Sequence, residues 1–126
     1  MNAANPLSDP GTPTHQARQR GLALIVDDEA TNRLILSKLL TKSGFEVIEA
    51  SSGARAIELF ETSEPRPGLV LMDLMMPLMD GYEATQRIKK IAGEDFVPVI
   101  FLTATTDQEA LAKCIEAGGD DFLTKP

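Results

Sequence analysis

A few polar residues that could do chemistry each stand at or near the end of a short, largely apolar run. They are Asp27 and Asp28, then Asp73, Thr103 and Lys125. Carboxylates packed close together repel one another and require a cation, and oxygen ligands without His or Cys favour Mg²⁺ over zinc. A carboxylate can also attack phosphorus and form an acyl phosphate. Such a step needs charge neutralisation above all, which Mg²⁺, the Lys125 ammonium and the Thr103 hydroxyl would supply.

The elements that must position these residues can be read from the apolar pattern. Unbroken apolar runs at residues 22–26, 69–72 and 97–102 predict strands buried on both faces. The alternating run at 45–49 predicts an edge strand, and 121–124 a last short strand. Helical patterns separate the strands. The predicted helices span residues 30–42, 52–62, 80–92 and 106–117, and Asp80 with Glu83, like Thr106 with Glu109, resembles a capping box.

This alternation of strands and helices predicts an α/β fold with a doubly wound parallel sheet and helices on both faces. Parallel strands place all of the polar residues at one edge of the sheet. The carboxylates after the first and third strands can meet only if those strands are neighbours, which the flavodoxin-like order 2-1-3-4-5 provides. In the first helix, we expect an apolar face for the core, formed by Leu34, Ile35, Leu36, Leu39 and Leu40.

Composition limits the classes of protein to consider. The 126 residues suffice for one domain with a core. The net charge of −7 argues against binding of nucleic acid or an anionic membrane. Cys114 is the single cysteine, and neither a membrane span nor an apolar signal segment is evident, so we expect a cytoplasmic protein. Residues 1–20 are rich in Pro, Ala, Asn and Thr, which predicts a disordered tail or linker before a domain at 21–126.

The ordered motifs resemble those of a known family. Asp27-Asp28, the Met-Asp-Leu-Met-Met-Pro-Leu-Met-Asp-Gly stretch at 72–81, Thr103-Ala104 and Lys125-Pro126 are similar to the signature of response regulator receiver domains. These domains are the phosphoacceptor modules of bacterial two-component signalling. Each motif is weak alone, but the set in this order is specific, and the resemblance covers residues 22–126.

The resemblance implies a role for each residue. Asp73 would accept a phosphoryl group from a sensor histidine kinase or a phosphotransfer protein, and would bind Mg²⁺ with its neighbours. Asp28 would bind the ion directly, Asp27 mainly through water, and Met75 through its backbone carbonyl. Thr103 would bond a phosphoryl oxygen after transfer. Lys125 would pair with Asp73 and then with the phosphate. Phe122 would stand at the aromatic switch position.

Each of these residues could also have a purely structural role. Asp27 could be a helix N-cap, Thr103 an ordinary strand-end hydroxyl, and Lys125 a solvated lysine. Phe122 could simply belong to the core. The family more often has Tyr at that position, whereas Phe keeps the ring but has no hydroxyl for a hydrogen bond.

Rival functions are also possible. A phosphatase of the haloacid dehalogenase type uses an Asp nucleophile after a strand, but expects a second acid where Met75 stands. A flavodoxin-like cofactor binder would carry a Ser/Thr/Gly phosphate loop after the first strand. A pseudo-receiver that acts only as an interaction module would have lost part of the acid, Thr and Lys set, and this chain keeps all of it.

The resemblance also implies a fifth helix after Lys125-Pro126, which this chain lacks. We therefore expect a receiver domain truncated before its last helix, with an output domain further along a longer parent chain. The strands at 22–26 and 69–72 should then keep an exposed apolar face, and such patches favour association. A homodimer is accordingly expected to be possible.

Overall fold

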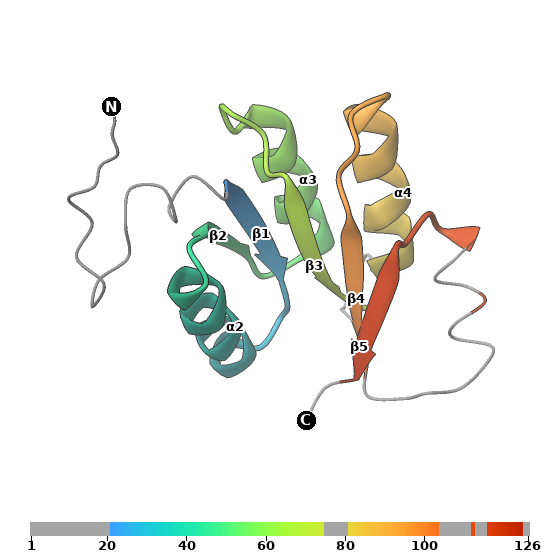
Figure 1. The fold of residues 1–126 in the computed structure, drawn as a ribbon. Coiled ribbons are helices and arrows are strands. Elements are labelled where there is room, and N and C mark those ends of the chain that lie inside the picture. The colour runs from blue at the N-terminus through green and yellow to red at the C-terminus, as the bar shows by residue number, and fades with distance from the viewer. Residues whose placement is uncertain (1–20, 75–80, 104–111, 113–115, 125–126) are drawn as a thin grey trace, which may run out of the picture.

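Five parallel strands form a sheet in the order β2-β1-β3-β4-β5 (Figure 1). The computed structural model describes residues 21–74, 81–103, 112 and 116–124. The strands are β1 (Leu22–Val26), β2 (Glu46–Ala50), β3 (Leu69–Asp73), β4 (Val99–Thr103) and β5 (Asp121–Thr124). The helices are α2 (Ala30–Lys42), α3 (Gly53–Thr62) and α4 (Gly81–Ala92). The predicted sheet order and fold class are confirmed.

The strand neighbours place the candidate site at one edge. β1 lies between β2 and β3, with Val26 opposite both Ala50 and Met72. Because all pairs are parallel, the carboxyl ends of the strands share an edge, where Asp27 and Asp73 lie.

One face of the sheet carries the larger core. Helices α3 and α4 cover it together (Figure 1), and the inward residues of α3, Ala56 and Phe60, are fully buried, as is Ile88 of α4. They pack against residues that alternate along the strands, a period that places every second side chain on this face. These strand residues are Leu24, Val26, Val70, Met72, Val99 and Phe101.

The opposite face carries α2 and differs from the prediction. Only Leu36 and Leu40 of the helix pack against the buried strand residues there, which are Ile25, Leu71 and Leu102. Leu34, Ile35 and Leu39 are about half exposed, at 53%, 49% and 58%. A single helix touches a sheet along a narrow stripe, so a five-residue apolar face is wider than the contact it makes.

The predicted exposure of the first and third strands is not observed. Every residue from Ala23 to Val26 is fully buried, and so are Val70 and Met72. Among the described residues, the exposed large apolar side chains lie instead on α2, on β5 at Leu123 and at Phe96.

Most element boundaries match the sequence-based expectation, but the strand predicted at 97–102 begins only at Val99, after Pro98, and ends at Thr103. The predicted β2 is one residue too early, because Phe45 precedes the strand and Ala50 ends it. Ser52 caps α3 and does not belong to it. The predicted helix at 106–117 and the capping residue Asp80 lie mainly outside the described residues, as does the whole tail at 1–20. In the part of the chain that the structure describes, no helix has the length and apolar character of a membrane span.

Candidate functional site

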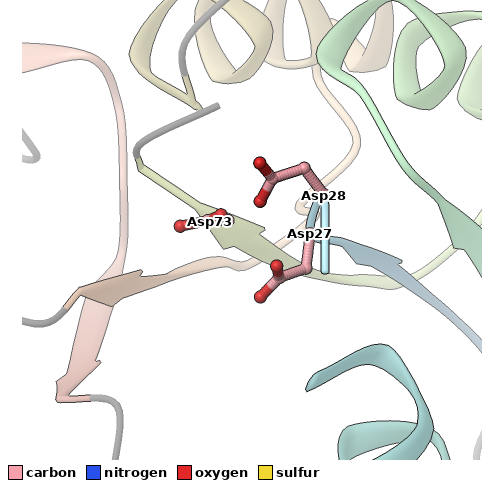
Figure 2. A group of neighbouring side chains, drawn as sticks. All are labelled: Asp27, Asp28 and Asp73. Atoms are coloured by element: carbon pink, nitrogen blue, oxygen red, sulfur yellow. The ribbon is translucent and has the colours of Figure 1, made fainter. Parts of the chain in front are cut away.

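Three carboxylates converge at the carboxyl edge of the sheet. Asp27 and Asp28 follow β1, and Asp73 is the last residue of β3 (Figure 2). One oxygen of each side chain lies within 4.8 Å of the others. Asp27 is fully buried and Asp73 is 3% exposed, whereas Asp28 is open to solvent. The predicted meeting of these acids is therefore observed, with two anchored inside the fold and one at its surface.

The loop after β1 is held by several hydrogen bonds. The backbone N–H of Asp27 donates to the carbonyl oxygen of Ala50 at 3.1 Å, which extends the pairing of β1 with β2. The Glu29 N–H donates to Asp27 Oδ1 at 2.9 Å. The N-cap of α2 is Glu29, so Asp27 is not the cap of that helix. Its side chain instead closes a short turn toward the helix, a local bond typical of Asp.

Arg33 is a residue of this site that the sequence analysis missed. Its Nη1 donates to the backbone oxygen of Asp27 at 2.8 Å, and its Nε lies 3.2 Å from Glu49 Oε1. The guanidinium therefore joins α2, β2 and the acidic loop. Nothing local in the sequence indicates this contact, because Glu49 lies sixteen positions away on another element.

Asp73 is held from the other side by the segment that ends β3. The Leu74 N–H donates to the carbonyl oxygen of Leu102 at 3.2 Å, and the Gly81 N–H donates to that of Leu74 at 3.1 Å. Gly81 is so close to β3 that a Cβ there would lie 3.0 Å from the carbonyl carbon of Asp73. This close approach makes Gly81 a point of contact between α4 and the candidate site.

The remaining predicted residues are described to different extents. Thr103 ends β4, is 5% exposed, and directly follows Leu102, the register partner of Asp73. The backbone of Phe122 lies in β5 opposite Phe101. Met75 and Lys125 lie outside the described residues, as does the side chain of Phe122.

The donor set suits a hard divalent cation. All three side chains offer carboxylate oxygens, the ligands that Mg²⁺ prefers over nitrogen or sulfur donors. The exposed position of Asp28 leaves the site accessible from solvent. The chemistry of the residues therefore fits the magnesium ion expected from the sequence.

Comparison with known proteins places this site in context. Residues 23–126 match the family "Response regulator receiver domain". The chain is 42% identical to "Chemotaxis protein CheY" of Bacillus subtilis over 104 residues, which is 82% of this chain and 83% of that protein. It is 41% identical to "Probable transcriptional regulator ycf27" of Porphyridium aerugineum over 108 residues, 86% of this chain. The chain spans only 43% of the length of that longer relative.

Solved structures of receiver domains share this fold. The receiver domain of the sensor histidine kinase PA1611 from Pseudomonas aeruginosa is 34% identical, with a TM-score of 0.72 over 83% of this chain and 84% of that one, and its magnesium ion is coordinated in the active site cleft. Another match is the receiver domain of Ssk1 from Saccharomyces cerevisiae, which was co-crystallised with the histidine phosphotransfer protein Ypd1. Its sequence is 29% identical to this chain. Its TM-score is 0.76 over 83% of this chain and 78% of that one.

Proposed function

The chain belongs to the response regulator receiver domain family, and from that premise we propose that Asp73 is its phosphorylation site. Receiver domains are phosphoacceptor signalling domains of two-component systems and not conventional enzymes. The observation that carries the proposal is the carboxylate cluster, in which Asp73 ends the central strand beside Asp27 and Asp28.

The proposed reaction transfers a phosphoryl group from a phosphohistidine. A carboxylate oxygen of Asp73 forms a bond to phosphorus, and the bond between phosphorus and the imidazole nitrogen breaks, leaving its electron pair on nitrogen. The match to a receiver domain that was co-crystallised with a histidine phosphotransfer protein supports this class of donor. The partner of this chain is accordingly a histidine kinase or a phosphotransfer protein.

We further propose that Asp27, Asp28 and Asp73 hold Mg²⁺, with the Met75 carbonyl as a further ligand. A bound magnesium ion would supply positive charge against the phosphoryl oxygens, in the manner of other phosphoryl-transfer sites. The protein itself fixes the orientation of one of these ligands. Buried Asp27 is held by hydrogen bonds on its backbone and side chain, so its carboxylate is oriented before any cation arrives.

Thr103 and Lys125 complete the proposed site. The Thr103 hydroxyl would donate to a phosphoryl oxygen, and the Lys125 ammonium would pair first with Asp73 and then with the phosphate. Because only the phosphorylated state offers Thr103 that oxygen, the two states differ in contacts, which is the requirement for a switch. Phe122 is the proposed aromatic element that reports the change to a partner.

Labelling with acetyl phosphate tests the assignment of Asp73. Intact-mass spectrometry should show one added phosphoryl group in the presence of Mg²⁺, and none in Asp73→Asn. Asp95→Asn is the matched control, because Asp95 is exposed and lies outside the acidic cluster. Substantial labelling of Asp73→Asn would refute the assignment.

Binding of beryllofluoride, which mimics the phosphoryl group, tests the switch. Backbone NMR signals of Thr103 and of β5 should move when beryllofluoride and Mg²⁺ are added together. Mg²⁺ alone serves as the control. If signals change only in the loops after β1 and β3, the phosphorylated state carries no switch through β4 and β5.

An interaction module that works without phosphorylation is not favoured. Such a module has no need for three converging carboxylates at the strand ends, which repel one another without a cation. The labelling experiment separates the two functions, because a pseudo-receiver would remain unlabelled with every donor.

A further inference from the structure

Lys89 on α4 and Asp120, directly before β5, form a contact that joins three parts of the fold. The Lys89 ammonium donates to Asp120 Oδ2 and to the carbonyl oxygen of Val97, each at 2.7 Å. The Val99 N–H donates to the same Oδ2 at 2.7 Å, and the Asp120 N–H donates to the Val99 oxygen at 2.9 Å. Asp120 therefore forms hydrogen bonds to both the N–H and the carbonyl oxygen of Val99, the first residue of β4. At the same time, Lys89 binds the carboxylate of Asp120.

The strand that follows this contact is short and lies at the end of the sheet. β5 has four residues, comes last in the sheet order, and is in register with β4. Asp121 and Leu123 are exposed. A short edge strand forms few hydrogen bonds with its neighbour that would prevent it from sliding along that strand. A contact that fixes one end of the edge strand therefore contributes much to its register.

The register of β5 decides where the next residue emerges. Thr124 is opposite Thr103, and Lys125 follows it directly in the sequence. A slip of two residues would keep each side chain on its face yet move the chain by about 6–7 Å. An ammonium group that neutralises charge in a transition state must be placed much more accurately than this, because a misplacement of ~1 Å can slow a reaction ~10²-fold.

We propose that Lys89 and Asp120 are a positioning pair that sets the register of β5 and, through it, the placement of Lys125 for phosphoryl transfer. The inference rests on the proposed function of Asp73. The pair acts from the opposite end of the sheet, because Val99 precedes Thr103 by the length of β4, or about 13 Å. It therefore leaves the three carboxylates untouched.

The rival interpretation is a simple surface ion pair with no positioning role. The two side chains are partly exposed, at 26% and 31%, and exposed pairs contribute little to stability. The Lys89–Asp120 pair differs from a simple surface pair in its hydrogen bonds to the backbone of β4. Asp120 accepts from a β4 amide as well as from Lys89, whereas the Arg87–Glu83 pair, at 3.0 Å, joins two residues one turn apart on α4. Arg87 therefore offers a matched control.

The test uses the full 126-residue chain with Asp120→Ala, Asp120→Asn and Lys89→Met, and Arg87→Met as the control. Three quantities are measured: the rate of labelling by acetyl phosphate, the Mg²⁺ dissociation constant by calorimetry, and hydrogen exchange of the β5 amides. Asp120→Ala should exchange β5 amides at least roughly tenfold faster, as expected on loss of a charge-assisted hydrogen bond. Its labelling should slow at least about tenfold, with Mg²⁺ affinity unchanged.

The other variants separate positioning from folding. Lys89→Met keeps the apolar stem and loses the charge, so it should slow labelling in the same direction and serves if Asp120→Ala does not fold. Asp120→Asn retains an oxygen for the Val99 N–H and should recover part of the rate. Arg87→Met should behave as wild type.

Two results would overturn the inference. One is an unchanged labelling rate in Lys89→Met or in a folded Asp120→Ala chain, and the other is a parallel loss of Mg²⁺ affinity, which would indicate general destabilisation. Failure of the wild-type chain to be labelled would instead refute the proposed function. The exchange of β5 amides would then still report whether the pair holds the strand.

Discussion

Gly81 provides the most demanding test of how the fold supports the acidic edge. It opens α4, and its N–H donates to the carbonyl oxygen of Leu74 at 3.1 Å. A Cβ at this position would overlap the carbonyl oxygen of Asp73 and would lie 3.0 Å from both the Asp73 carbonyl carbon and Leu74 Cα. All three atoms belong to the backbone, so no change of rotamer can make room. Gly81→Ala must therefore push α4 away from β3.

The size of the effect follows from two opposing contributions. Overpacking a well-packed site costs about 1–3 kcal/mol, and a clash with backbone belongs at the upper end of that range. Alanine in place of glycine favours a helix by about 1 kcal/mol, which offsets part of the cost. The free energy of unfolding should thus fall by about 2 kcal/mol. For a domain of this size, the corresponding decrease in Tm is about 8–16 °C.

Thermal and urea unfolding measure this loss, with Gly68→Ala as the control. A Cβ on Gly68 would have no atom within 4 Å, and that glycine does not adopt a positive φ. Gly68→Ala should therefore be neutral or stabilise by up to ~1 kcal/mol through the unfolded chain. Gly81→Ala should also be labelled more slowly at Asp73, whose backbone it displaces. If Gly81→Ala melts at or above the temperature of Gly68→Ala, the proposed close contact between α4 and β3 is wrong.

Three further changes test separate parts of the structure. The Thr85 hydroxyl is fully buried and has no hydrogen-bond partner among the described residues. Thr85→Val should therefore raise the free energy of unfolding by about 1 kcal/mol. Chemical unfolding measures this change, and a loss of stability would contradict the prediction. Ser52 caps α3 by accepting from the Arg55 N–H at 3.1 Å, so Ser52→Ala should cost ~1 kcal/mol, whereas exposed Ser51→Ala should be neutral; equal unfolding curves would exclude the cap. Asp28→Asn should weaken Mg²⁺ binding by more than roughly tenfold, and an unchanged calorimetric titration would remove it from the site.

The sequence by itself determined the fold class and most of the candidate site. Each buried strand of a parallel sheet is apolar on both faces, so it is recognisable as an unbroken run, and the polar residue after it marks the edge. Asp27 and Asp73 were located in this way. The strand order also followed, because the carboxylates can meet only if β1 and β3 are neighbours, as the structure confirms.

Only the tertiary structure decided which residues support that edge. The apolar stripe of α2 did not reveal that Leu36 and Leu40 contact the sheet while Leu39 is exposed, because the pattern is wider than the contact. Long-range pairs were equally hidden. Lys89 and Asp120 are separated by 31 positions, and each by itself is a common surface residue. Their contact depends on how closely α4 and β5 approach β4, a distance set by packing across the whole sheet and recorded in no local pattern.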